Sequence, residues 1–369
     1  MKRILVFGLT KTVGGVESYI RNVVYNIDRT KYYFDFLIVG EEEKACFEDE
    51  FNELFNDGKN HFYHCPNMKK GFLYTNRWLR HFYQTHHYDM IYMNVTTAAR
   101  IMYCNYAVTK QGIPLITHNH CGSAVSKKAS INNNVFKRYT TMKSIVKLTC
   151  SYEAFEYGFT CPKEEGRIIK NGIDVKRFEY NDSYRLEMRR LCNIDEDKVV
   201  IGHVGRFATE KNHEYFIKLS RMLGEKYIFV CIGEGELKES FIRSIEENNL
   251  ANRFRVLPFS TSTEKYYSLM DIFAMPSLYE GLPLVAVEAQ ASGLPCVFSD
   301  TISRQSDICG HSEFIPLDDP MGWVDAIKRT MIERYDNRES LVNAGFDAKT
   351  TADTVGDIFE MVGTKYGTN

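Results

Sequence analysis

With 369 residues, the chain is longer than a single hydrophobic core usually serves, so its length favours two domains. Hydrophobic residues make up 44% of it and charged residues 25%, which is typical of a globular protein and excludes a disordered or fibrous one. The formal net charge of −2 argues against a nucleic-acid-binding protein, which usually has a strongly basic face.

The ten cysteines are spread singly along the sequence and none forms a C-x-x-C pair. They therefore indicate neither a zinc site nor a disulfide framework, and reduced thiols fit a reducing compartment. The apolar run Ile4–Phe7 is too short for a signal peptide, and no later stretch is long enough to cross a bilayer. We therefore expect a cytoplasmic protein. Three short basic clusters could contact the inner face of the membrane, although such clusters are at least as often a solvated surface. They are Lys69-Lys70, Lys127-Lys128 and Lys137-Arg138.

The first half alternates apolar runs with helical stretches. Ile4–Phe7 predicts a buried strand, and apolar residues recur at helical spacing between Val16 and Ile27. Strands that alternate with helices indicate parallel βαβ units in a doubly wound sheet. Further strands are expected at Phe34–Val39, Met90–Met93, Leu115–Thr117, Lys147–Cys150 and Arg167–Ile169.

The second half repeats this pattern, so we predict two Rossmann-like α/β domains, residues 1–175 and 176–351. The polar stretch Asp174–Asp197 has no strand signal and is the expected connection. A last helix near Thr351–Met361 could pack on either domain, and we allow the segment 352–369 to return to the first. Strands are expected at Val199–Val204, Tyr227–Ile232, Phe254–Leu257, Ile272–Met275 and Cys296–Phe298, with helices at Glu214–Leu223 and Pro283–Ala291.

Ligands of doubly wound sheets bind beyond the carboxyl ends of the strands, and two such domains would face each other across a ligand-binding cleft. Gly14-Gly15 follows the first strand and precedes the first helix, where a phosphate could approach the backbone. A tight turn explains the two glycines equally well. Their spacing does not match G-x-G-x-x-G, which argues against a nicotinamide cofactor.

His118 and His120 follow the strand Leu115–Thr117. We expect the two side chains to point in opposite directions, so that they would not share a metal ion. One of them could enter the cleft and hydrogen-bond a sugar hydroxyl, although a lone histidine is more often structural.

Gly205-Arg206 ends the first strand of the second domain, and Lys211 follows in the loop. A planar guanidinium and a compact ammonium together can neutralise a diphosphate. Ordinary loop cations are the alternative interpretation.

The segment from Pro276 to Glu288 carries the strongest signal. Gly281 permits a tight turn, Pro283 suits a first helical turn, and the amides of Leu284 and Val285 would then form an anion site. Glu288 lies in an apolar stretch, where ribose hydroxyls would satisfy its carboxylate. The alternatives are an exposed helix face or an internal salt bridge for Glu288, and a turn carboxylate for Glu280.

Glu280 and Glu288, with seven residues between them, resemble the E-x7-E motif of the retaining GT-B glycosyltransferases of family GT4 (glycosyl transferases group 1). Five further segments resemble the family in the same order, and six ordered matches are specific. A softer likeness, from Ser299 to Trp323, is to the capsule and exopolysaccharide branch. The five segments are Gly14–Glu17, His118–His120, Asn171–Asp174 with Phe178, Gly205–Phe207 with Lys211-Asn212, and Gly233–Glu236.

The resemblance implies roles for these residues. Arg206 and Lys211 would hold the donor diphosphate, Glu288 the ribose and Glu280 the transferred sugar, while His120, rather than His118, would contact the sugar at the reacting centre. Gly14, Gly15, Gly205, Gly281, Leu284 and Val285 would complete the donor site. Pro258-Phe259 departs from the family, which often has a glycine at that place. His-Asn-His followed by Cys121-Gly122 is also not the commonest form of its segment in the family.

We therefore expect a retaining, metal-independent transferase without a cofactor. It would move a sugar from a nucleotide diphosphate donor, a UDP-sugar, to a saccharide acceptor, which we expect to be lipid-linked. No Asp-x-Asp is well placed for a metal, and we assign no enzyme nucleophile. Two alternatives remain: a GT-B-like nucleotide-sugar 2-epimerase, and a non-catalytic nucleotide-sugar-binding partner in an assembly complex.

Overall fold

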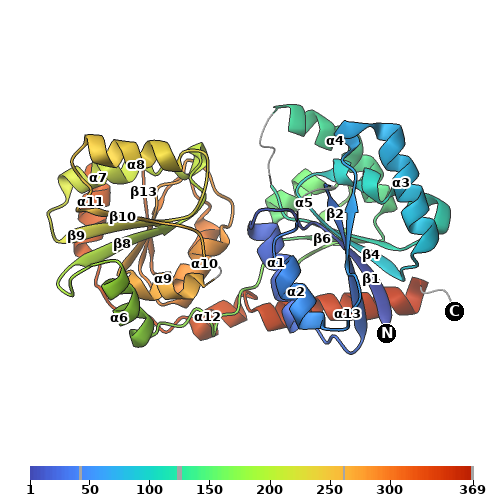
Figure 1. Ribbon diagram of the computed structural model, residues 1–369. Coiled ribbons are helices and arrows are strands. Elements are labelled where there is room, and N and C mark those ends of the chain that lie inside the picture. The colour runs from blue at the N-terminus through green and yellow to red at the C-terminus, as the bar shows by residue number, and fades with distance from the viewer. Residues whose placement is uncertain (41–43, 123–126, 261, 367–369) are drawn as a thin grey trace. The chain divides into compact units, whose positions relative to one another are not determined.

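The computed structural model describes residues 1–40, 44–122, 127–260 and 262–366, with the side chains of residues 127–129 left out. It divides into two compact units (Figure 1). Unit 1 comprises Met1–Gly172 together with Ala348–Asn369, and unit 2 comprises Ile173–Asp347. Each unit is built around its own parallel sheet, as expected for two Rossmann-like domains.

Unit 1 contains a seven-stranded sheet in the order β3-β2-β1-β4-β5-β6-β7, and all its neighbouring strands are parallel. The chain adds β2 and β3 on one side of β1, and then β4 to β7 on the other side. The strand order therefore reverses between β1 and β4. This reversal creates a crevice at the carboxyl end of the sheet. The strands are β1 (Lys2–Phe7), β2 (Tyr32–Val39), β3 (Phe62–Cys65), β4 (Met90–Val95), β5 (Leu115–Asn119), β6 (Val146–Thr149) and β7 (Gly166–Ile168).

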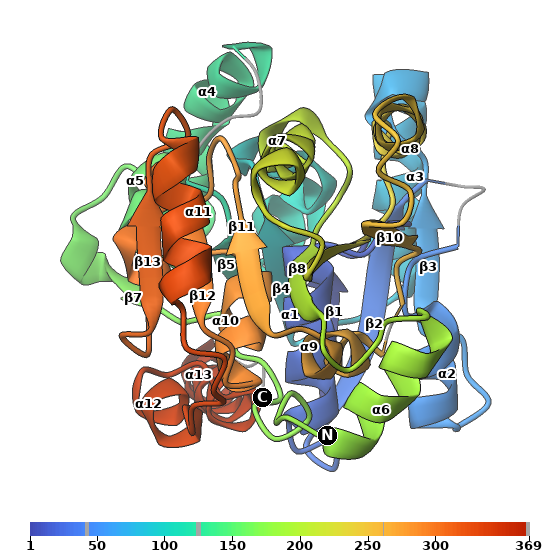
Figure 2. The same cartoon turned by 90° about the vertical axis from the view of Figure 1, so that its left-hand side faces the viewer.

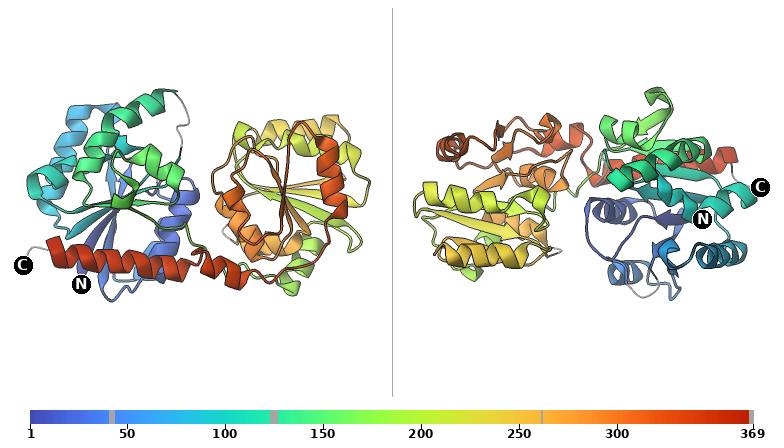
Figure 3. Two further views of the ribbon diagram at one scale, coloured as in Figure 1. Left: turned by 180° about the vertical axis from the view of Figure 1, so that it is seen from behind. Right: turned by 90° about the horizontal axis from the view of Figure 1, so that it is seen from above.

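Helices cover both faces of this sheet. On one face, α1 (Gly15–Asn26), α2 (Glu48–Phe55) and α13 (Ala348–Tyr366) share one apolar core. Figure 3 shows α13, the last helix of the chain, lying along unit 1, where the Tyr32 hydroxyl donates to the carbonyl of Gly356 at 3.0 Å. On the other face, α3 (Phe72–Thr85), α4 (Lys127–Lys143) and the 3-10 turn η2 (Ala98–Tyr103) border a second core. The short helix α5 (Tyr152–Gly158) follows β6.

Unit 2 contains a six-stranded parallel sheet in the order β10-β9-β8-β11-β12-β13, with the reversal between β8 and β11. Figure 2 shows these two strands side by side. The central strands are mostly apolar because both faces of the sheet are buried. The strands are β8 (Val199–Val204), β9 (Tyr227–Ile232), β10 (Phe254–Leu257), β11 (Ile272–Met275), β12 (Cys296–Ser299) and β13 (Ser312–Ile315).

The helices of unit 2 also form two layers. One core is shared by α7 (Glu214–Met222), α8 (Lys238–Glu247) and α11 (Pro320–Arg329). The other is shared by α6 (Asp182–Leu191), α9 (Thr263–Leu269), α10 (Leu284–Ala291) and α12 (Arg338–Asn343).

The predicted central strands are confirmed, most of them to within a residue or two. Two edge strands, β3 and β13, were not predicted, because they are short and carry polar residues. The stretch Asp174–Asp197 is not a simple connection: it lies in unit 2 and includes α6, which packs on α9. Pro283 is the N-cap of α10 and lies just before its first turn.

Candidate functional site

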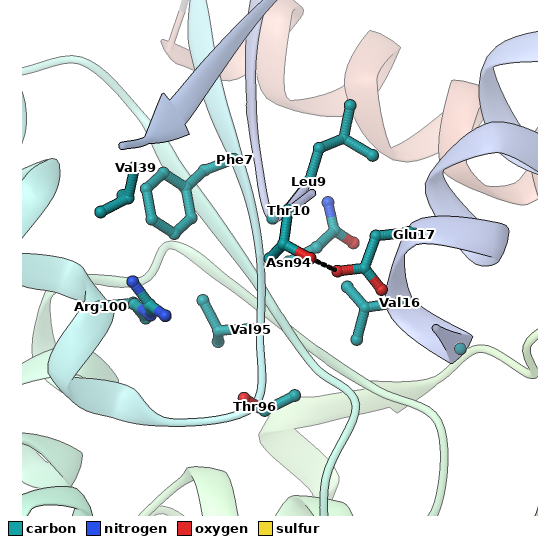
Figure 4. Close-up of a pocket in the computed structure, with 12 residues that line it drawn as sticks. Phe7, Leu9, Thr10, Val16, Glu17, Val39, Asn94, Val95, Thr96 and Arg100 are labelled. Atoms are coloured by element: carbon teal, nitrogen blue, oxygen red, sulfur yellow. Dashed lines mark hydrogen bonds between the residues drawn. The ribbon is translucent and has the colours of Figure 1, made fainter. Parts of the chain in front are cut away.

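In unit 1, a pocket of about 280 Å³ lies where the strand order reverses (Figure 4). Phe7 and Val95, at the ends of β1 and β4, contribute to its wall, together with Asn94 and Arg100. Of the predicted residues, only Gly15 belongs to its lining, beside Glu17 from the first turn of α1.

The start of α1 is already occupied by a carboxylate of the chain. Gly14 is the N-cap, and Glu17, three residues later, accepts hydrogen bonds from the backbone amide of Gly14 and from the Thr10 hydroxyl at 2.7 Å. This is the arrangement of a capping box, with glycine as N-cap. Burial nevertheless raises the pKa of Glu17. A phosphate at this helix end would therefore compete with a carboxyl group that already occupies it.

His118 and His120 lie on the same side of the chain. Their rings stack with centroids 4.0 Å apart, so the expectation that they point in opposite directions was wrong. Side chains alternate along a strand, and residues two apart therefore share a face. His118 is itself part of β5, fully buried, with Nδ1 2.9 Å from the Tyr92 hydroxyl.

His120 lies just beyond the end of β5 and is half-buried. Its Nε2 lies 3.0 Å from Oδ1 of Asn94, and its Nδ1 lies 3.1 Å from Oδ1 of Asn171. Burial lowers the pKa of His120 to about 3, so the ring is neutral near pH 7. A neutral imidazole donates from one nitrogen only, so one of the two asparagine amides must present its NH2 group to the ring.

In unit 2, the structure brings Lys211 and Glu280 together as an ion pair. Lys211 belongs to the 3-10 turn η5 (Thr209–Lys211) after β8, and Glu280 lies in the loop after β11. Gly205 lies beside this lysine, but the neighbour that a side chain there would crowd is His203, whose Nε2 would lie 2.9 Å from a Cβ on Gly205. The Leu278 amide also donates to the Glu210 carbonyl at 2.8 Å, which ties the two loops together.

Arg206 does not join this pair. Its guanidinium donates to the Glu210 carboxylate at 2.8 Å, and its side chain is 61% exposed. A side chain so exposed can change rotamer at little cost, since a surface ion pair of this kind contributes at most about 1 kcal/mol.

The loop Gly233–Gly235 after β9 packs directly on the Gly205–Phe207 segment. Both glycines have positive φ, +155° and +153°. A Cβ at Gly233 would lie 2.0 Å from the Gly205 carbonyl oxygen, and one at Gly235 would lie 2.4 Å from that of Phe207. The approach of these two backbones requires glycine at both positions.

The first turn of α10 differs from that of α1. It contains no acidic residue and no capping side-chain hydrogen bond. The amides of Leu284 and Val285 precede the first intrahelical hydrogen bond and are free to bind an anion. Gly281 is not required for a tight turn, because its φ is not positive and a Cβ there would meet nothing within 4 Å.

Glu288 lies one turn further along α10, half-buried. The side chain is not on an exposed helix face, and the Tyr267 hydroxyl of α9 donates to its Oε2 at 2.7 Å. Burial raises the pKa of Glu288 to about 7. The Arg177 guanidinium favours the ionised form from nearby and itself donates to Glu264 at 2.7 Å and 3.0 Å.

Several of these partners were not anticipated from the sequence, among them Tyr267, Arg177, Asn94 and Glu17. The first three reach their partners only through tertiary packing. Glu17 carried a local signal, because it stands three residues after a helix N-cap.

Over the described residues, no three His, Cys, Asp or Glu side chains gather as metal ligands. All ten cysteines lie in the described ranges, and none forms a disulfide. No helix there combines the length and hydrophobicity that a membrane span needs.

The family model described as "Glycosyl transferases group 1" matches residues 185–347, which includes most of unit 2. A putative glycosyltransferase of Bacillus subtilis, EpsF, is 29% identical over 94% of both chains. An Escherichia coli enzyme named UDP-Gal:alpha-D-GlcNAc-diphosphoundecaprenol alpha-1,3-galactosyltransferase is 26% identical, over 67% of this chain and 69% of its own.

The crystal structure of Anabaena HepE in complex with UDP and glucose has a similar fold. The TM-score is 0.76, with 17% identity, over 98% of this chain and 100% of the HepE chain. WaaG, a glycosyltransferase of lipopolysaccharide biosynthesis, gives a TM-score of 0.68 with 11% identity, over 96% of this chain and 99% of its own. The predicted fold class is thereby confirmed.

Proposed function

We propose that the chain, which has the GT-B fold, is a glycosyltransferase of group 1 and a retaining, metal-independent enzyme that uses a nucleotide diphosphate sugar. One observation carries the proposal. Lys211 and Glu280 form an ion pair, and Glu280 lies four residues before the first residue of α10, which has no side-chain cap. A cation, a carboxylate and free helix amides are thus held by adjoining loops at the carboxyl edge of one sheet.

The chemical difficulty of the reaction is charge separation. As the diphosphate departs with its electron pair, the sugar becomes oxocarbenium-like, and fixed positive groups lower that barrier. In our proposal Lys211 and Arg206 neutralise the leaving diphosphate, with Arg206 turning from Glu210. The amides of Leu284 and Val285 bind phosphate or sugar oxygens.

The remaining residues bind the donor and assist the sugar. Glu288 accepts hydrogen bonds from the ribose hydroxyls, held in place by Tyr267. Glu280 stands beside the transferred sugar, and Gly205 and Gly281 leave room for the donor. Gly14 and Gly15 are proposed donor contacts in unit 1, although the Glu17 carboxyl group already binds the Gly14 amide. Neutral His120, rather than buried His118, contacts the sugar by a hydrogen bond.

Relatives support a UDP-sugar donor and a lipid-linked saccharide acceptor. The E. coli relative is named for UDP-galactose and a diphosphoundecaprenol acceptor, and HepE binds UDP and glucose. A Campylobacter jejuni relative, 27% identical over 53% of this chain, is also named for a diphospho-undecaprenol acceptor. We propose that this chain acts in surface polysaccharide synthesis, in the cytoplasm at the inner face of the membrane.

A screen of nucleotide sugars, with and without a lipid-linked acceptor, tests the proposal. Nucleoside diphosphate release that depends on both substrates supports it. Conversion of the nucleotide sugar to its 2-epimer would favour an epimerase, and binding without turnover would favour a non-catalytic partner.

A further inference from the structure

Basic residues are strongly segregated along the chain. Residues 58–152 contain thirteen Lys and Arg but a single acidic residue, Asp89, a formal charge of +12, whereas the whole chain has a formal charge of −2. This span runs from just before β3 to just after β6, entirely in unit 1, and includes α3 and α4.

The two helices of this basic span cover the same face of the sheet. Leu79 and Phe82 of α3 belong to the core on that face, and Phe136 and Tyr139 of α4 pack against it. The outer sides of both helices therefore belong to one layer of unit 1.

Helix α4 departs from the usual amphipathic pattern, because it exposes apolar residues while polar residues are buried beside Phe136 and Tyr139. Its inner side carries buried polar residues: Asn133 accepts from the Ala98 amide at 2.7 Å, and Thr140 donates to the Ala98 carbonyl at 3.0 Å. Its outer side exposes Ile131, Val135 and Met142 by 64%, 67% and 71%. Surface helices normally bury their apolar side, so this outer stripe indicates that something apolar covers it.

The start of α3 shows the same combination. Phe72, Leu73 and Tyr74 are 53%, 82% and 57% exposed. Exposed Lys69 precedes them and exposed Arg77 follows one turn later. On α4, exposed Arg138 lies between Val135 and Met142.

We propose that the outer sides of α3 and α4 form a surface that binds an anionic lipid membrane. Apolar side chains flanked by Lys and Arg suit the boundary between headgroups and acyl chains, where the apolar groups enter and the cations stay at the anionic headgroups. A second copy of the chain would bring two strongly basic layers together. A nucleic acid would leave the aliphatic side chains without an apolar partner. The inference is consistent with the proposed lipid-linked acceptor, but its test does not depend on sugar transfer.

Vesicle co-sedimentation tests the inference directly. The full chain is mixed with phosphatidylcholine vesicles, with or without a quarter of phosphatidylglycerol, at low and high salt. We expect the protein to bind the anionic vesicles, and to bind them more weakly at high salt, because salt screens the attraction between the basic residues and the anionic headgroups. Two double variants, Leu73→Ser/Arg77→Gln on α3 and Val135→Ser/Arg138→Gln on α4, should each lower the partition coefficient by about tenfold, since one basic residue alone accounts for about fivefold.

A matched control exists in unit 2, where Arg190 and Leu191, the last two residues of α6, are exposed. The double variant Arg190→Gln/Leu191→Ser makes the same changes and should bind vesicles like the wild type. Circular dichroism and nucleotide affinity show whether each variant is folded. Absence of wild-type binding to anionic vesicles would overturn the inference, as would equal binding by folded α3 and α4 variants. A wild-type dimer in light scattering that the α4 variant loses, without vesicle binding, would assign the surface to a second copy instead.

Discussion

Lys211 and Glu280 form an ion pair that joins the loop after β8 to the loop after β11, with side chains only 16% and 17% exposed. The pair lies where the strand order of the unit 2 sheet reverses, the usual ligand position in such sheets. The ion pair also fixes the distance between the two groups. We place the Lys211 ammonium at the leaving diphosphate and the Glu280 carboxylate beside the transferred sugar, on the two sides of the bond that breaks.

Lys211→Ala should lower kcat/KM by about a hundredfold to a thousandfold, the cost of removing one preorganised group that stabilises transition-state charge. It also leaves the Glu280 carboxylate largely buried and unpaired, so we expect a loss of about 1–3 kcal/mol in unfolding free energy. Steady-state kinetics and urea unfolding measure the two effects. The double variant with Glu280→Gln should recover stability but not activity; recovery of both would exclude the catalytic role of the lysine.

Arg206→Ala should lower turnover by orders of magnitude while changing the unfolding free energy by no more than about 0.5 kcal/mol, since the side chain is mostly exposed. Glu210→Gln is the matched control, because it removes the negative charge that holds the guanidinium of Arg206. Its turnover should equal or exceed that of the wild type. Near-normal turnover of Arg206→Ala would remove this arginine from the mechanism.

Glu288 should make nucleotide binding depend on pH. Its pKa, raised to about 7 by burial, means that the carboxylate form that accepts ribose hydroxyls dominates only above neutrality. The dissociation constant for the nucleotide should therefore fall as the pH rises from about 6 to about 8. Calorimetry of wild type and Glu288→Gln measures this. A glutamine variant with the same pH dependence would assign the effect to another group.

The raised pKa of Glu288 also makes the stability of the protein depend on pH. Stability falls as the pH rises, whereas a carboxylate in an ion pair makes it rise. Unfolded Glu288 loses its proton near pH 4.5, whereas the folded protein holds it to about 7. Stability therefore falls between these values, by up to about 3 kcal/mol, and stays constant above them. Glu288→Gln should flatten this part of the pH–stability curve.

His120→Gln should make the protein less sensitive to acid. The unfolded histidine gains a proton near pH 6.5, while burial keeps the folded ring neutral down to about 3. The wild type therefore loses stability as the pH falls below 6.5, by as much as about 1.4 kcal/mol per pH unit for this residue alone. His118, also held neutral by burial, contributes in the same direction. An unchanged slope in His120→Gln would contradict the assignment.

Gly235→Ala should destabilise the protein by more than about 2 kcal/mol, because its φ of +153° and the nearby Phe207 carbonyl leave no room for a Cβ. It should also displace Arg206, which adjoins Phe207. Gly281→Ala, at a position with open space, should change unfolding free energy by less than about 0.5 kcal/mol. Equal effects of the two substitutions, measured by urea unfolding, would refute this distinction.

The sequence was most informative where a strand is buried on both faces. Val199–Val204 is buried throughout and apolar apart from Gly202 and His203, and its ends were predicted to the residue. The edge strand Ser312–Ile315 has one buried side at most and mixes polar with apolar residues, so its local pattern is weak. Similarly, the polar α6 was not predicted, because its stability depends on packing against α9 rather than on its own composition.

The candidate site was predictable as a set of residues but not as a set of contacts. Lys211 and Glu280 are 69 residues apart, and nothing in the spacing of either loop indicates that they meet. The expectation that His118 and His120 point in opposite directions was wrong, because residues two apart on a strand lie on the same face. The basic span 58–152, by contrast, was readable from the sequence, and only its placement on α3 and α4 needed the fold.

One reaction mixture tests the central claim most directly: the enzyme, its nucleotide sugar and a lipid-linked acceptor, in excess EDTA. We predict equal amounts of nucleoside diphosphate and glycosylated acceptor, with the anomeric configuration of the donor retained in the product by proton NMR. An inverted product, loss of activity that Mg²⁺ restores, or an epimerised nucleotide sugar without glycosylated acceptor would contradict the account.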